Sequence, residues 1–232
     1  MPKTFKHSGD LGDIIYSLPT VRALGGGVLF LDPNGGQGII PHLPRTRLNA
    51  ALIQSIRPLL VRQPYIQDVL PWAGEPIDYD LDKFRDTDTP KNISDVHLEA
   101  FGLPSSERDR AWLSVDDPIT IPGRQLVINR TVRFQSNHTF WENFMFGYKN
   151  ECVFVGLPKE HEIFVYTFEV DIPYYPTPDV LTLARVIAGS AQLIANQSLC
   201  HAIAQGLQHN LVCEVYQFWP NAVFHRPKAQ YV

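Results

Sequence analysis

HSGDLGDIIYSLPTVRAL, residues 7–24, places two glycines and two aspartates directly before an apolar helical pattern. The preceding residues, KTFKHS (3–8), have the composition of a β-strand. Glycines between a strand and a helix let the backbone turn tightly, and the first N–H groups of the helix then face a possible ligand. The stretch therefore predicts the opening strand, turn and helix of a Rossmann-like βαβ unit.

The turn carries Gly9, Asp10, Gly12 and Asp13, and its aspartates have two possible roles. An aspartate at this position can simply cap the helix, which is worth about 0.5–2 kcal/mol. Asp13 is the more interesting, because the apolar sequence IIYSLP follows it directly. A carboxylate held at the edge of a crevice can act as a general base toward an acceptor hydroxyl.

The same alternation of strands and helices continues outward from this turn. In the first half, the patterns predict strands at 26–32 and 66–72, helices at 13–24, 45–63 and 93–104, and a charged loop at 75–92. In the second half, they predict strands at 125–131, 152–157, 192–197 and 211–216, and helices at 140–148, 159–168, 178–190 and 198–207. Pro19 predicts a kink or an early end of the first helix.

The order of these elements predicts an α/β protein with two small Rossmann-like domains and parallel sheets. Residues 114–124, SVDDPITIPGR, read as a linker, so we expect domains at 1–117 and 118–232. Ligands of such sheets bind beyond the carboxyl ends of the strands. The candidate functional residues are therefore those in the strand-to-helix turns.

Composition narrows the class of protein. The 232 residues are 44% hydrophobic and 19% charged, which is ordinary for a folded protein. The net charge of −4 lacks the excess of basic residues that nonspecific nucleic-acid binding requires. The N-terminus lacks a signal-peptide core, and no apolar run is long enough to span a bilayer, so we expect a cytoplasmic protein. Cys152, Cys200 and Cys213 lack metal-site spacing and are expected to be buried thiols.

The turn after the strand at 125–131 reads NRTVRFQSNHTFWE and carries Arg130, Thr131, Arg133 and His138. Arginines at the carboxyl end of a strand suit a diphosphate, because guanidinium groups present forked donors to phosphate oxygens. The alternative is a solvated loop with surface arginines. His138 alone says little, since an isolated histidine usually has a structural role.

The third turn joins the strand at 192–197 to a helix of small residues. Gln197 and Ser198 lie at the helix N-terminus, where an anion or a sugar hydroxyl can bind. A simple Ser198 cap on a close-packed helix explains the same pattern. Cys200 and His201 are adjacent and therefore point about 100° apart on a helix, which disfavours a thiol nucleophile.

Together the turns resemble a known arrangement. GDIIYSLPTVRAL resembles the N-terminal signature of the heptosyltransferase-like glycosyltransferases, glycosyltransferase family 9. DVLTLARVIAGSAQLIANQSLCHAIAQGL resembles that family's second signature, a leucine-rich helix, a strand, a polar N-D-S-G turn and a small-residue helix with an early histidine. The two signatures stand in the family's order and in opposite halves of the chain.

The resemblance implies a GT-B fold, with two Rossmann-like domains facing a cleft, the first on the acceptor side and the second holding a nucleotide-sugar donor. It implies that Asp13 is the catalytic base of an inverting transfer that needs no metal and no cofactor besides the donor. The turn of Gly9, Asp10 and Gly12 would shape the substrate loop. A separate set would contact the donor: Arg130, Thr131, Arg133, Gln197, Ser198 and His201.

The chain departs from the family pattern at several positions. Gln197 stands where the family has aspartate, Leu199 stands where it has glycine, and the loop's lysine is not recognisable. A degenerate, non-catalytic nucleotide-sugar-binding protein is therefore one alternative, and a nucleotide-sugar hydrolase or epimerase on the same scaffold is another. The acceptor stays open among a glycan, a small molecule, a protein and modified DNA.

Overall fold

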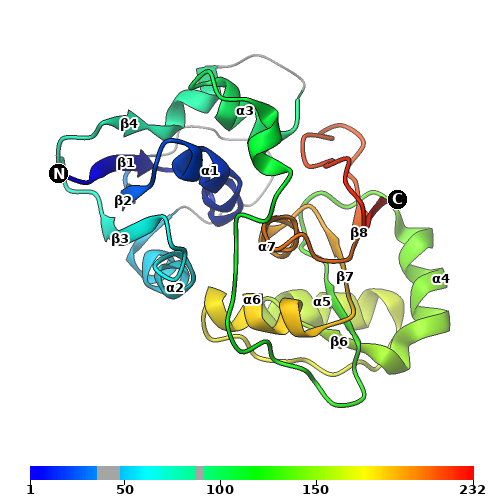
Figure 1. Ribbon diagram of the computed structural model, residues 1–232. Helices are drawn as coiled ribbons and strands as arrows, with labels where there is room; N and C mark the ends of the chain where they lie inside the picture. Colours follow the sequence, from blue (N-terminus) through cyan, green and yellow to red (C-terminus); the bar gives the residue numbers. More distant parts are fainter. Residues whose placement is uncertain (36–47, 87–90) are drawn as a thin grey trace. The chain divides into compact units, whose positions relative to one another are not determined.

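The computed structural model of the chain describes residues 1–35, 48–86 and 91–232 (Figure 1). The chain forms two compact units, Met1–Ser114 and Val115–Val232. Each contains a parallel sheet with helices, so the predicted α/β class with two Rossmann-like sheets is confirmed. Within the described residues, no helix has both the length and the apolar character needed to cross a bilayer.

The first unit is built on a sheet of four described strands. Its elements are β1 (Lys3–His7), α1 (Leu11–Ala23), β2 (Gly27–Leu31), α2 (Ala50–Leu60), β3 (Ile66–Pro71), β4 (Tyr79–Asp80), η1 (Leu81–Asp86), α3 (Ile93–Glu99) and η2 (Ser105–Arg108). The strand order is β3-β2-β1-β4, and every pairing is parallel. The chain order reverses between β1 and β4, so the carboxyl ends of these strands form the unit's switch point, where ligands of such sheets bind.

Helix α1 follows the turn that the sequence predicts, but it does not end at Pro19. Proline cannot donate to the carbonyl of Ile15 one turn earlier. In this protein the indole N–H of Trp112 donates to that carbonyl at 3.1 Å, and the helix continues to Ala23. The cost of a proline inside the helix is therefore partly offset by a side chain from the end of the unit.

The prediction of a loop over residues 75–92 is wrong for residues 79–86, which form β4 and η1. Tyr79 pairs with Phe5 and Asp80 with Lys6 in the parallel β1–β4 ladder, and η1 follows directly. The rings of Phe5 and Tyr79 stack at 5.1 Å, and Lys6 Nζ lies 2.8 Å from Asp80 Oδ2. These contacts join distant parts of the sequence, so no local periodicity marks them. Residues 87–90 of that predicted loop, and residues 45–47 of the predicted second helix, lie outside the described residues.

The second unit has a sheet of five described strands. Its elements are β5 (Leu126–Asn129), α4 (His138–Tyr148), η3 (Lys149–Glu151), β6 (Cys152–Phe154), α5 (Pro158–Phe168), α6 (Val180–Gly189), β7 (Gln192–Asn196), α7 (Leu199–Gly206), β8 (Leu211–Glu214) and β9 (Ala229–Tyr231). The order β6-β5-β7-β8-β9 is parallel throughout and reverses between β5 and β7. The switch point of this unit therefore lies at the carboxyl ends of β5 and β7.

Strand β9 is absent from the sequence-based prediction. It is only three residues long, so an alternating pattern cannot develop. It is held at the sheet edge by pairing with β8 and by the Tyr231 hydroxyl, which accepts a hydrogen bond from Gln205 at 3.0 Å and donates one to the Phe224 carbonyl at 2.9 Å. The final strand thus depends on contacts with other parts of the second unit rather than on a pattern of its own.

Candidate functional site

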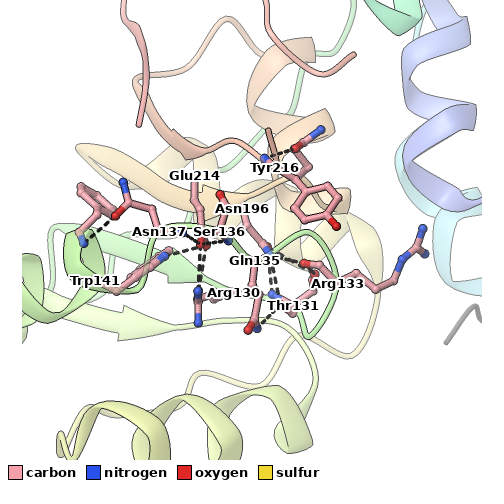
Figure 2. Close-up of polar contacts among 12 residues, drawn as sticks. Arg130, Thr131, Arg133, Gln135, Ser136, Asn137, Trp141, Asn196, Glu214 and Tyr216 are labelled. Atoms are coloured by element: carbon pink, nitrogen blue, oxygen red, sulfur yellow. Dashed lines mark hydrogen bonds and ion pairs between the residues drawn. The ribbon is translucent and has the colours of Figure 1, made fainter. Parts of the chain in front are cut away.

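The loop of residues 130–137 follows β5 and passes over the switch point of the second unit (Figure 2). Asn196, the last residue of β7, holds its first half. The Asn196 side-chain carbonyl accepts the Thr131 N–H at 3.0 Å, and its amide donates to the Thr131 carbonyl at 3.1 Å and the Arg133 carbonyl at 2.6 Å. A single buried amide therefore fixes the backbone on both sides of Val132.

Glu214, the last residue of β8, holds the two ends of the same loop. Its carboxylate accepts from Arg130 Nε and Nη2 at 2.8 and 2.9 Å, and from the backbone N–H groups of Ser136 and Asn137 at 2.7 Å each. The indole N–H of Trp141 also donates to it, at 2.8 Å. Burial alone would raise the pKa of Glu214, but these hydrogen bonds hold it below its ordinary value. Figure 2 shows the carboxylate at the centre of these donors.

The two arginines of the loop consequently lie in different environments. Arg130 is 6% exposed, its Nε and Nη2 are engaged by Glu214, and its guanidinium lies 5.3 Å from the Phe168 ring. The Arg133 side chain extends away from the Glu214 cluster in Figure 2, and its guanidinium lies 4.9 Å from the Phe134 ring. Arg133, which is half-buried, is therefore the arginine of this loop whose side chain lies outside the ion-pair cluster.

The third turn lies beside this loop. Ser198 donates from its hydroxyl to the side-chain oxygen of Asn129 at 2.9 Å, so the carboxyl ends of β5 and β7 are joined. Gln197 uses both ends of its amide, donating to the Trp219 carbonyl at 2.8 Å and accepting the Tyr216 N–H at 2.6 Å. The structure thus brings Ser198 to the switch point and places the Gln197 amide against the chain beyond β8.

The structure places His201 inside the second unit. Its ring is fully buried and lies 3.0 Å from the Gln205 amide through Nε2. Burial lowers the pKa of His201 to about 3. The neighbouring Cys200 is also buried, and burial raises the pKa of its thiol, in agreement with its expected inert character. Neither side chain lies at the surface of the turn.

Asn129 and Glu160 also lie at this edge, and the sequence interpretation overlooked both. Glu160 accepts the Leu157 N–H at 3.1 Å at the start of α5, and burial raises its pKa. Gly156 has a φ of +117°, and a Cβ there would lie 2.9 Å from the Glu160 carboxylate and clash with the Asn129 amide. The signal was a strand followed by Gly-Leu-Pro and an acidic residue, another tight strand-to-helix turn.

In the first unit, Asp13 takes part in the expected cap. Its carboxylate accepts the N–H of Asp10, the residue before α1, at 3.3 Å, and its side chain is half-buried. Gly9 packs against it, since a Cβ at Gly9 would lie 2.9 Å from Asp13 Oδ2 and 2.6 Å from His7 Cε1. Gly12 lies in the first turn of the same helix. The glycine turn therefore lets the Asp13 carboxylate lie close to the end of β1.

A second carboxylate, Asp82, lies at the same switch point and was not predicted. It follows β4 and accepts the Ser8 N–H at 3.1 Å, with an ion pair to Arg85 and Lys6 Nζ at 3.5 Å. Burial alone would raise its pKa, but interactions with His7, the Ser8 N–H and Arg85 hold the pKa at about 2. Asp82 is therefore a heavily engaged carboxylate with little basicity near neutral pH.

The Glu214 cluster predicts an asymmetry between two substitutions. Glu214→Leu leaves the buried Arg130 cation and three N–H donors without their acceptor, so we expect a loss of about 3–5 kcal/mol in the free energy of unfolding. Arg130→Met should cost clearly less, because Glu214 keeps the donors from Ser136, Asn137 and Trp141. Urea unfolding of the two variants measures the difference.

Trp141→Phe is the matched control, since it removes one donor and retains an aromatic ring. We expect it to cost about 1 kcal/mol. Equal losses for Glu214→Leu and Arg130→Met would mean that the carboxylate is held by Arg130 alone, which contradicts the cluster described above.

Comparison with known proteins finds similarity to solved structures only. No family model matches the sequence, and no curated protein matches it either. A glycosyltransferase family 9 protein from Veillonella parvula DSM 2008 matches with a TM-score of 0.64 and 11% identity, over 99% of this chain and 84% of that one. E. coli heptosyltransferase WaaC with ADP-2-deoxy-2-fluoro heptose matches with a TM-score of 0.64 and 9% identity, over 100% and 93%.

A third structure is the iron-containing dodecameric glycosyltransferase TibC from enterotoxigenic E. coli H10407. It matches with a TM-score of 0.62 and 13% identity, over 98% of this chain and 61% of that one. All three likenesses extend over nearly the whole of this chain, across both parallel sheets. The chain therefore has the GT-B-like fold of the glycosyltransferase family 9 heptosyltransferases, the fold that the two sequence signatures imply.

Proposed function

We propose that this chain is a glycosyltransferase that moves a sugar from a nucleotide-sugar donor to an acceptor hydroxyl. The observation that carries the proposal is the loop of residues 130–137, which Asn196 and Glu214 fix at the switch point of the second unit, with the Arg133 side chain extending away from the Glu214 cluster. A fixed cation at the carboxyl edge of a parallel sheet suits the diphosphate of such a donor. In this proposal residues 1–117 form the acceptor-side domain and residues 118–232 the donor domain.

The proposed reaction needs a base and a group that accommodates the leaving diphosphate. Asp13 takes the proton of the acceptor hydroxyl, and the freed oxygen attacks the anomeric carbon of the sugar from the face opposite the diphosphate. The bond between that carbon and the diphosphate oxygen breaks, giving an inverted glycoside and a nucleoside diphosphate. Arg133 stabilises the charge that develops on the diphosphate, so the transfer is proposed to proceed without a metal.

Other residues of the two turns have supporting roles in the proposal. The turn of Gly9, Asp10 and Gly12 shapes the surface next to Asp13. The donor side uses the hydroxyl oxygens of Thr131 and Ser198, whose positions are set by Asn196 and Asn129. Arg130 contributes by holding Glu214, and through it the loop.

The donor that we propose to test first is an ADP-sugar. Structural neighbours have been solved with ADP and with ADP-heptose or its 2-deoxy-2-fluoro analogue. Binding of ADP should stabilise the protein by about 2.7 kcal/mol at a hundred times its dissociation constant. Arg133→Gln should weaken ADP binding about 10- to 100-fold, the range for one lost charge-assisted hydrogen bond.

Arg62→Gln is the matched control, because Arg62 is an exposed arginine on the first unit that donates to the Pro58 carbonyl. We expect it to leave ADP binding unchanged in titration calorimetry. Equal affinity for ADP in the Arg133→Gln variant would remove the main support for the proposal.

A non-catalytic nucleotide-sugar-binding protein is a second candidate, and one observation favours it. The Gln197 amide and the Arg130 fork, both expected to contact the donor, are engaged by other parts of the protein. Binding of an ADP-sugar without transfer or hydrolysis, over a panel of hydroxyl acceptors, would select this candidate. Release of ADP in the absence of any acceptor would instead indicate a hydrolase.

A further inference from the structure

The segment just beyond β8 reads Tyr-Gln-Phe-Trp, residues 216–219, and exposes apolar rings beside the proposed donor site. The Trp219 N–H donates to the Tyr216 carbonyl at 2.9 Å, so these residues form a β-turn, which we call the aromatic turn. Phe218 is 70% exposed and Trp219 is 50% exposed. Exposed apolar side chains that are contiguous, unlike scattered ones, are a feature of binding surfaces.

Gln197 fixes this aromatic turn at both of its end residues. Its side-chain oxygen accepts the Tyr216 N–H at 2.6 Å, and its side-chain nitrogen donates to the Trp219 carbonyl at 2.8 Å. An aspartate, the residue that the family signature has here, offers two acceptors and no donor. Glutamine therefore supplies both the acceptor and the donor that hold the aromatic turn, whereas a carboxylate has no donor for the Trp219 carbonyl.

The aromatic turn continues a row of side chains that begins at Arg133, the residue proposed to bind the diphosphate. The Arg133 guanidinium lies 4.9 Å from the Phe134 ring, the Phe134 ring lies 5.8 Å from Tyr216, and the Tyr216 ring lies 5.4 Å from Phe218. Tyr216 follows β8, which is the neighbour of β7 in the sheet, and adjacent strands are about 4.8 Å apart. A cation at one end and flat rings at the other match the phosphate and base of one nucleotide.

We propose that the aromatic turn is the surface on which the base of the donor nucleotide stacks, and that Gln197 is the positioning residue that holds it. The proposal rests on the nucleotide-sugar function given above and adds the group that recognises the base. Every base has a flat face that can stack on an aromatic ring. Because Gln197 already holds the turn in the free protein, the turn loses little conformational entropy when the base binds.

The test uses the full chain and the fluorescence of its four tryptophans. Trp112 and Trp141 are buried, so quenching by acrylamide reports mainly on Trp219 and Trp72, and a Trp219→Phe variant assigns the Trp219 part. We expect ADP to protect Trp219 from acrylamide, whereas inorganic diphosphate binds and leaves Trp219 accessible. GDP and UDP are titrated alongside to cover other bases.

Two variants separate stacking from phosphate binding. Phe218→Ala should weaken nucleoside diphosphate binding by roughly 5- to 100-fold, the range for one lost stacking ring, and leave diphosphate binding unchanged. Gln197→Glu keeps the acceptor for Tyr216 but removes the donor to Trp219, so it should raise the quenching of Trp219 in the free protein and weaken nucleotide binding. Phe146→Ala, which removes a 93% exposed ring on α4, is the matched control and should change neither.

The binding measurements distinguish a failure of base stacking on the aromatic turn from a failure of the proposed nucleotide-sugar function. A nucleoside diphosphate that binds while Trp219 stays fully quenchable, with unchanged affinity in Phe218→Ala, would overturn the aromatic turn as the base site. Failure of every nucleoside diphosphate and of diphosphate to bind would overturn the proposed function itself.

Discussion

Acidification from pH 6.5 to pH 4 is expected to unfold this protein, because buried histidines of both units are held neutral in the folded state. Burial lowers the pKa of His7 and His209 to about 4 and of His201 to about 3, and it lowers the pKa of His97 well below its ordinary value. In the unfolded chain the same rings have a pKa near 6.5. The unfolded state therefore binds protons first, and stability that is complete above pH 6.5 is lost as the pH falls toward 4.

The expected size of the effect is large. Each histidine contributes a slope of up to about 1.4 kcal/mol per pH unit within this window. His7 and His97 lie in the first unit and His201 and His209 in the second, so each unit should lose up to about 3 kcal/mol per pH unit. Whole domains are stable by only about 5–15 kcal/mol. Carboxylates with a lowered pKa, among them Asp82 and Glu214, add to the loss only as the same groups protonate in the unfolded chain, near and below pH 4.5.

Urea unfolding at pH 7, 6 and 5, followed by circular dichroism, measures this dependence. His97→Phe should raise the stability of the first unit at pH 5, since the ring can keep its contact with Phe84, whose centroid is 4.0 Å away. Neither nitrogen of His97 has a hydrogen-bond partner among the described residues, so the phenylalanine loses no such bond there. His138→Gln, at an exposed position, should have little effect. Equal stability at pH 7 and pH 5 would contradict the assignment of neutral buried histidines.

The helices and strands that the sequence predicts are those whose pattern is local. The turn before α1 could be identified because glycines, a capping aspartate and an apolar helix stand next to one another. Strand β4 could not, because its two residues are stabilised by Phe5 and Lys6, more than seventy positions earlier. Asp82 was missed for the same reason, since its place at the switch point depends on that pairing.

In the candidate site, too, the sequence does not reveal contacts between residues that are far apart along the chain. Arg130 has the sequence context of a phosphate ligand, and its partner Glu214 lies 84 positions later at the end of another strand. Gln197 is visible in the sequence only as a departure from the family signature, and its hydrogen bonds to Tyr216 and Trp219 give that departure a physical reason. Residue type can be read locally, whereas the engagement of a side chain depends on the tertiary fold.

Asp13→Asn is expected to lower the rate of sugar transfer by about 10²- to 10⁴-fold, the usual contribution of a general base. Asparagine keeps an oxygen that can accept the Asp10 N–H, so the cap of α1 should persist and the protein should remain folded. It has no basic oxygen that can take the proton of an acceptor hydroxyl. The loss should therefore appear in the rate at saturating donor, with donor affinity unchanged, because the donor is proposed to bind the other unit.

Asp179→Asn is the matched control for this substitution. Asp179 caps α6 by accepting the Thr182 N–H at 2.7 Å, and asparagine caps a helix about as well as aspartate does. Transfer should be unchanged in this variant, and both variants should unfold at nearly the wild-type urea concentration. Full transfer activity in Asp13→Asn would exclude Asp13 as the base. Asp82, a second carboxylate at that switch point, is held at a pKa of about 2 and offers little basicity in its place.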